Sequence, residues 1–255
     1  MVYLVSRSSG SCVIICMNFF IRKRKIVLDC FTHLSFVYDH TPIAPAIRHI
    51  PQWLKDTPAT TSNNDPTIKS CIGLIEYSKR GIVIPSWFEM DLTIHEKDHP
   101  ENRWYDWNAS HDEVTTDSHP DEQYDQYATP NGHNMKIISP WHFRTNKFVQ
   151  FTWTQPLWHH RHIMKAIQIL PAVIDFHHNH STHINTLLIN EKEPQSIRIE
   201  PNMPLVMLHP MTDAQIEIKN HLVSKKDHER IIGKDKLFLP CSNLYHKKRK
   251  LSCPR

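Results

Sequence analysis

The chain has 255 residues, of which 40% are hydrophobic and 22% are charged, and its formal net charge at pH 7 is +4. These values are typical of globular proteins and argue against a wholly disordered chain. Only five glycines are present, and they stand far apart. The G-x-G-x-x-G turn and the G-x-x-x-x-G-K-[ST] phosphate loop need closely spaced glycines, so both nucleotide-binding motifs are excluded.

The cysteines and the charged runs indicate little about partners. Six cysteines are scattered without C-x-x-C spacing, which favours reduced thiols in a cytosolic setting over a disulfide framework. Basic residues gather near the two ends, at 22–25 and 246–250. Solvated tails account for these runs better than contacts with nucleic acid or a membrane surface, and we expect neither of those partners.

The N-terminal apolar run, residues 12–21, is followed by basic residues. A membrane span needs about twenty apolar residues, and a signal peptide carries its positive charge before the apolar segment. The run therefore fits neither a transmembrane helix nor a signal peptide. We expect translation to begin at Met17, because the sequence from there leads directly into the first predicted strand.

A proline-broken connector separates the first predicted strand from those that follow it. Within this connector, residues 46–54 are expected to form one helical turn and residues 57–67 a loop. The second and third predicted strands, residues 68–77 and 82–84, are expected to pair as a hairpin that turns at Gly81. The fourth alternates between apolar and polar side chains, as half-buried strands do. These strands cover residues 25–32, 68–77, 82–84 and 87–95.

The next part of the chain, residues 96–133, is polar and acidic, and is predicted to be a long excursion with a turn at 130–132. Its aromatic side chains suit contact with a sugar or a protein, although we favour their packing back onto the sheet. Residues 157–165 are expected to cross a corner. The strands predicted beyond the excursion cover residues 135–139, 141–145, 148–154, 166–176 with a kink at Pro171, 184–189, 196–199 and 203–209, the last after a Pro-Asn turn.

Beyond residue 214, we expect a strand to about residue 222, then a charged helix or loop, and a disordered tail after Tyr245. Many short strands with proline-rich turns predict a mainly β protein, a single β-sandwich or jelly-roll-like domain with long loops. The predicted organisation is an N-terminal extension at 1–24, a β-rich core at 25–211 and a charged C-terminal extension at 212–255.

Four of the seven tryptophans follow a proline by one or two residues. Proline marks the ends and edges of strands, and a large aromatic side chain beside it fills the core. We therefore expect Trp87, Trp141 and Trp158 to be structural aromatic pins of the fold.

Twenty histidines are present, and His177, His178, His180 and His183 lie close together. Imidazole is the commonest protein ligand for transition metals. If residues 176–180 are extended, His178 and His180 share one face, so the segment is a candidate site for a divalent metal. Its spacing matches no zinc motif, which favours the alternative of solvated histidines.

His119-Pro-Asp121 has the His-x-Asp spacing of the two-histidine, one-carboxylate site that binds non-haem iron. In this hypothesis His183 or a neighbour is the third ligand and Arg198 anchors a substrate carboxylate. The acidic loop around His119 is a poor place for a rigid ligand pair. No G-x-S-x-G is present, and Glu89 and Asp91, on one face of a predicted strand, are better explained as solvated acids than as a glycosidase pair.

Several segments resemble an uncharacterised protein family of contractile-tailed bacteriophages of marine bacteria, which is distantly similar to a bacterial domain of unknown function. The resemblance spans residues 25–211 and implies phage or phage-derived origin, and so a place in the host cytoplasm or the virion. The family pattern has glycine where this chain has Asn202, and often at Ala172. The segments are TIKSCIGLIEYSKRGIVIPSWFEMDLTI, KIISPWHFRT, TQPLW, LPAVIDF, INTLLI and IRIEPNMPLVMLHP.

We therefore expect a phage-type accessory or virion-associated β-sandwich protein that acts by binding a protein or a glycan rather than by catalysis. The alternative is a metal-dependent jelly-roll enzyme, such as a non-haem iron oxygenase. A nucleic-acid-binding protein that uses its basic ends is the weakest hypothesis.

Overall fold

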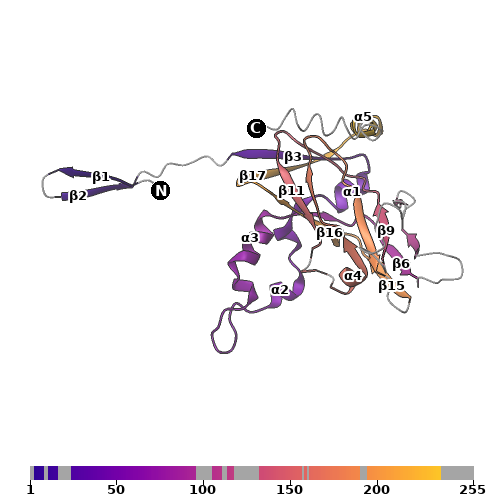
Figure 1. The fold of residues 1–255 in the computed structure, drawn as a ribbon, viewed down its shortest axis with the longest axis horizontal. Helices are drawn as coiled ribbons and strands as arrows, with labels where there is room; N and C mark the ends of the chain where they lie inside the picture. The colour runs from indigo at the N-terminus through magenta and orange to yellow at the C-terminus, as the bar shows by residue number, and fades with distance from the viewer. Residues whose placement is uncertain are drawn as a thin grey trace.

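The computed structural model describes residues 3–8, 11–16, 24–95, 105–110, 114–117, 132–156, 158–159, 161–189 and 194–236 (Figure 1). The helices are α1 (Ser35–His40), η1 (Ala46–His49), α2 (Gln52–Asp56), η2 (Ile68–Ser70), α3 (Ile72–Arg80), α4 (Arg161–Ala166) and α5 (Lys225–Lys236), where η marks a 3₁₀ helix. The strands of the N-terminal half are β1 (Tyr3–Ser8), β2 (Ser11–Cys16), β3 (Lys25–Thr32), β4 (Ala44–Pro45), β5 (Ile82–Pro85), β6 (Met90–Ile94), β7 (Tyr105–Ala109) and β8 (Thr116–Asp117). The later strands are β9 (Gly132–Ile137), β10 (His142–Thr145), β11 (Gln150–Thr154), β12 (Ile167–Ile169), β13 (Ala172–Asp175), β14 (Ile184–Ile189), β15 (Gln195–Ile199), β16 (Pro204–Pro210) and β17 (Gln215–Leu222).

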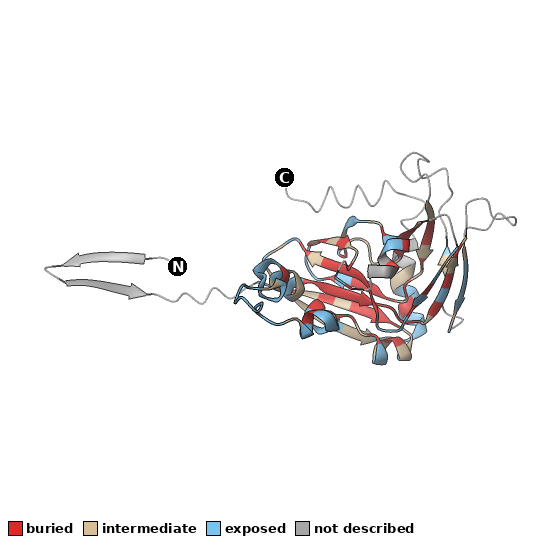
Figure 2. Ribbon diagram, turned by 90° about the horizontal axis from the view of Figure 1, so that it is seen from below, coloured by how far each residue is buried: buried red, intermediate tan, exposed pale blue. Residues whose placement is uncertain are grey.

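The described strands form five sheets, in the orders β1-β2, β10-β3-β17, β13-β11-β16-β5-β4, β12-β14-β9-β8 and β15-β6-β7. Among them, pairing is antiparallel except between β3 and β17, which run parallel. One hydrophobic cluster unites buried side chains from all four sheets other than β1-β2, and these lie along the strands at the centre of the molecule (Figure 2). The prediction of a mainly β, sandwich-like single domain is confirmed.

Most predicted strands are present, and those with strict alternation agree best. In β6, Met90, Leu92 and Ile94 are buried, whereas Asp91 is exposed and Thr93 is half-buried. The predicted strand at 166–176 is divided into β12 and β13 by the break at Pro171. Two short helices, η1 and α2, occupy the region predicted to make a helical turn, and α4 lies within the predicted corner.

The hairpin predicted around Gly81 is wrong, because residues 68–80 form η2 and α3 instead of a strand. Ile72 and Ile75 lie one helical turn apart, a spacing that fits a helix better than a strand. Lys79 and Arg80 in the last turn suit the negative end of the helix dipole. The helix ends at Gly81, whose N–H donates to the Tyr77 carbonyl at 3.0 Å, so this glycine ends a helix and does not turn a hairpin.

The predicted Pro-Asn turn joins β15 to β16. The Met203 N–H donates to the Glu200 carbonyl at 3.2 Å, and Asn202 has φ of 64°. A proline followed by a residue of positive φ is typical of a type II turn, and asparagine tolerates that conformation better than most residues. Asn202 is therefore compatible with the turn without a glycine at this position.

Some sequence predictions concern residues outside the described part of the chain. They are the start at Met17, the turn residues Pro130 and Asn131, and the tail after Tyr245. Residues 215–222, assigned to the C-terminal extension from the sequence, form β17, which pairs with β3 along its whole length.

We predict opposite effects for alanine at two glycines of this region. A Cβ at Gly81 would lie 2.8 Å from Met207 Sδ, 2.9 Å from the Tyr77 carbonyl and 3.0 Å from Ala46 Cβ. We expect Gly81→Ala to lower the free energy of unfolding by about 1–3 kcal/mol, because the backbone carbonyl cannot move aside freely. In Gly73→Ala, the added Cβ meets only Cys71 Sγ at 3.8 Å, and the gain in helix propensity should stabilise by about 0.5–1 kcal/mol. Urea unfolding of both variants measures the difference, and equal effects would contradict the packing of α3.

Candidate functional site

The four histidines predicted as metal ligands lie in the connection between β13 and β14, and each contacts a different group. His178 Nδ1 lies 2.7 Å from Asp175 Oδ1, and His180 Nδ1 lies 2.9 Å from the Phe143 carbonyl. His177 Nδ1 lies 3.3 Å from the Thr145 carbonyl, and His183 Nδ1 accepts the Ser139 N–H at 3.2 Å. Three of these bonds attach the connection to β10 and the segment before it, and that of His178 attaches it to the end of β13, so the rings do not converge on one point.

The extended conformation assumed for residues 176–180 is not observed, because the chain turns at 176–178. Within the described ranges, no three histidine, cysteine, aspartate or glutamate side chains are placed to hold a metal ion. His119 and Asp121 lie outside those ranges.

Arg198, the predicted substrate anchor, forms an ion pair with Glu89 and lies 3.5 Å from Asp91 Oδ1. The carboxylates considered as an acid–base pair are therefore held by an arginine on the neighbouring strand β15. Cross-strand charge pairs of this kind stabilise a sheet, and this role accounts for all three residues.

Two of the three predicted aromatic pins are buried, and the third is not. Trp87 and Trp141 have exposed fractions of 3% and 0%, whereas that of Trp158 is 39%. Trp158 instead packs at the surface beside Trp53, with ring centroids 6.3 Å apart. The Trp53 indole N–H donates to the Trp158 carbonyl at 3.0 Å, which fixes the pair with part of each ring exposed.

A hollow of about 450 Å³ brings together four histidines that are far apart in the sequence. His33 follows β3, His142 begins β10, His183 precedes β14 and His228 belongs to α5. The His228 ring centroid lies 4.5 Å from that of His33 and 4.8 Å from that of His142. Ser224 Oγ accepts the Asp227 N–H at 3.1 Å, a cap that starts α5 where it can place His228 against the core.

The imidazoles of His142, His183 and His228 are held neutral. Burial, followed by the charge of the His228 ring, lowers the pKa of His142 to about 3. Burial lowers the pKa of His183 to about 4, helped by Lys136 and opposed by Asp117. Burial and then the His33 ring lower the pKa of His228 to about 4, against the Pro140 carbonyl and Glu229. The walls between the rings are apolar and include Leu34, Ile138, Pro140 and Ile232.

An apolar surface lies over the helices η1, α2, η2 and α3. A groove of about 250 Å³ separates these helices, and Lys55, Lys69 and Ser78 contribute its polar lining. Its apolar lining consists of Ile47, Ile50, Leu54, Leu74 and Ile75. We define the helical surface as this groove together with the exposed side chains of Ile47, Trp53, Ile68, Ile72 and the adjacent Trp158, of which Ile72 is 77% exposed.

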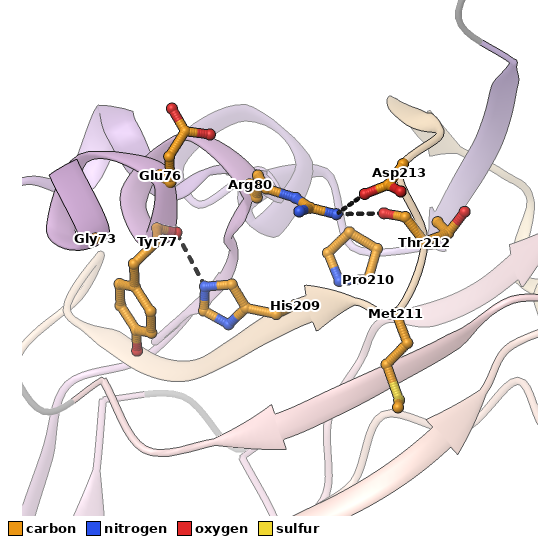
Figure 3. Close-up of a pocket in the computed structure, with 9 residues that line it drawn as sticks. All are labelled: Gly73, Glu76, Tyr77, Arg80, His209, Pro210, Met211, Thr212 and Asp213. Atoms are coloured by element: carbon orange, nitrogen blue, oxygen red, sulfur yellow. Dashed lines mark hydrogen bonds and ion pairs between the residues drawn. The ribbon is translucent and has the colours of Figure 1, made fainter.

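Another hollow, of about 580 Å³, lies between α3 and the end of β16 (Figure 3). Arg80 bonds there to the Thr212 carbonyl and pairs with Asp213. His209 Nε2–H donates to the Tyr77 carbonyl at 2.9 Å, and the two rings pack 4.2 Å apart. Since Arg80 already faces a carboxylate, these contacts serve to join α3 to the turn after β16.

No family model, curated protein or solved structure matches the chain. The resemblance to the phage family thus stays a prediction from the sequence. Among the described residues, no helix is long and apolar enough to cross a bilayer. Sequence reasoning missed His33, His142 and His228, although His142 gave a signal as a lone histidine inside the apolar segment ISPWHF.

The neutral histidines predict a steep loss of stability in acid. In the unfolded chain their pKa is about 6.5, so below this pH the unfolded chain binds protons that the folded chain excludes. Stability is therefore full above about pH 7 and falls as the pH approaches the folded-state values near 4 and 3. For three such groups we expect the free energy of unfolding to fall by roughly 2–4 kcal/mol per pH unit between pH 6 and 4.5, measured by urea unfolding.

His142→Gln isolates this contribution from that of other titrating groups. The variant should lower the slope of the free energy of unfolding against pH by roughly 1.4 kcal/mol per pH unit, the contribution of about one proton. His40→Gln, at an exposed position at the end of α1, should leave it unchanged. Equal slopes in all three proteins would contradict the neutral cluster.

Proposed function

We propose that this chain is a phage-type accessory protein, associated with the virion, that works by binding another protein through its helical surface. The resemblance of residues 25–211 to the phage family supports the origin. The observation that carries the binding role is the concentration of exposed tryptophan and isoleucine side chains around the groove of α2 and α3. Large exposed apolar patches on soluble proteins mark interaction sites.

The composition of the helical surface favours a protein over a glycan. Tryptophans dominate the energetics of protein interfaces, and aliphatic side chains around a groove accept an apolar anchor from a partner. A sugar needs a dense set of polar partners, whereas Ser78 and two lysines make up the polar lining of the groove. The Trp53 indole N–H is already bonded within the chain, so this side chain presents mainly its ring face.

The charges of the groove indicate the chemistry of the partner. Lys55 and Lys69 line it, and no carboxylate does in the part of the chain that the structure describes. Lys69 reaches back over the groove, where its ammonium donates to the Lys55 carbonyl at 2.6 Å. We therefore expect an amphipathic segment that combines large apolar side chains with aspartate or glutamate.

The metal-dependent enzyme is less well supported than a binding role. Its candidate ligands His177, His178, His180 and His183 make separate hydrogen bonds. Arg198, which was to hold the substrate, is engaged by Glu89 and Asp91.

A peptide-display selection against the folded protein tests the proposal. We expect selected peptides to be rich in leucine, phenylalanine or tryptophan together with acidic residues. Trp53→Ala and Ile72→Asp should each weaken the binding of a selected peptide by about 30-fold, the effect of losing one central interface residue. Fluorescence anisotropy of the labelled peptide measures the affinity.

Val173→Asp is the matched control, because this side chain is 56% exposed on β13, outside the helical surface. It should bind the peptide as the parent protein does. Basic peptides, or peptides that bind the Ile72→Asp variant equally well, would overturn the proposal. So would a dimer in sedimentation that Ile72→Asp dissolves, because the occupant would then be a second copy of this chain.

A further inference from the structure

The histidine hollow contains polar atoms that the protein itself leaves without partners. His142 and His228 are each 3% exposed and line the hollow. His142 Nδ1, His228 Nε2 and His33 Nδ1 are buried and have no hydrogen-bond partner. Leaving a buried polar atom without a partner is unfavourable, so such atoms are rare unless a ligand or water bonds to them. The three rings that carry these atoms all line this one hollow, which makes it a candidate binding site.

The charges around the hollow favour a negative ligand. Lys225 and Glu229 line it from α5, beside His33, His142, His183 and His228. Farther out, His180, Lys136 and Asp117 act on the rings by their charge. His142, His183 and His228 can each gain a positive charge, and among the described lining residues Glu229 is the carboxylate that opposes them, at an exposed position.

We propose that this hollow binds a small organic anion, a carboxylate with an apolar body, and takes up a proton from solvent as the anion enters. His142, His183 and His228 are neutral at pH 7, because burial lowers the pKa of each ring and, for His142 and His228, neighbouring imidazole rings lower it further. A bound carboxylate counteracts this lowering. The proton then goes from solvent to a ring nitrogen, and the imidazolium donates a charge-assisted hydrogen bond to the carboxylate.

The walls and the size of the hollow specify the rest of the ligand. Leu34, Ile138, Pro140 and Ile232 form apolar walls beside the rings, and these suit a hydrocarbon or aromatic body. The volume of about 450 Å³ lies within the usual range for pockets that hold small molecules. A phosphate ion is less well matched, because among the described residues Lys225 is the only lysine or arginine that lines the hollow.

Titration calorimetry with benzoate tests the proposal, and neutral benzamide of the same shape is the control ligand. Benzoate is ionised at both pH 6.0 and pH 7.5. We expect it to bind about 30-fold more tightly at pH 6.0 than at pH 7.5, because uptake of one proton per ligand changes the affinity tenfold per pH unit. Repeating the titration in buffers with different ionisation enthalpies counts that proton. Benzamide should show neither the pH dependence nor the uptake.

Two variants at the rim of the hollow should change the affinity for benzoate in opposite directions, and neither alters the buried rings. Lys225→Gln should weaken benzoate binding about threefold and Glu229→Gln should strengthen it about threefold, as expected for charges near the hollow. His142→Gln and His228→Gln should abolish the pH dependence, with near-ultraviolet circular dichroism to show that they fold. Ile72→Asp should bind benzoate normally, so this site and the proposed protein-binding surface succeed or fail separately.

Three results would overturn the proposal. The first is equal binding of benzoate and benzamide. The second is benzoate binding with no proton uptake, and the third is no binding of either ligand at pH 6.0. Rim variants that shift the affinity in the same direction would also contradict an electrostatic role for this hollow.

Discussion

β16 is hydrogen-bonded along both edges, to β11 and β5, and six of its seven residues are buried. The Thr154 hydroxyl donates to the Met207 carbonyl, and the Asn202 N–H at the preceding turn donates to the Ser86 carbonyl. His209, near its end, reaches α3 through the Tyr77 carbonyl. The position of this strand therefore determines where the helices that carry the apolar surface can sit.

The two candidate sites arise from different parts of this arrangement. The helical surface lies on the helices η1, α2, η2 and α3. The helix α5, which lines the histidine hollow, lies on the opposite side of the molecule from α2 and α3 (Figure 1). The helical surface has apolar side chains that are exposed to solvent, whereas the histidine hollow contains neutral imidazoles that are buried. The residues that would contact a ligand in the hollow are different from those of the helical surface.

The strands could be predicted where one face is buried, because apolar side chains then recur at every second residue, as at Met90, Leu92 and Ile94. The helix α3 was missed because a short apolar run gives similar signals for a strand and a helix, and the helical spacing of Ile72 and Ile75 is only one turn long. Adjacent histidines were noticeable in the sequence, yet His183 alone of that group joins the hollow. Its partners His33, His142 and His228 come from separate elements, and no spacing rule relates residues that meet only through tertiary pairing.

The pairing of β3 with β17 affects how the chain can fold. β3 is made early in synthesis, yet both of its partners, β10 and β17, follow much later in the sequence. Contacts between such distant segments carry a high loop-closure cost and slow the search for the native state. A nascent chain that ends at residue 211 would leave one edge of β3 open, and open strand edges promote aggregation. The smallest piece that can assemble this sheet therefore extends through residue 222.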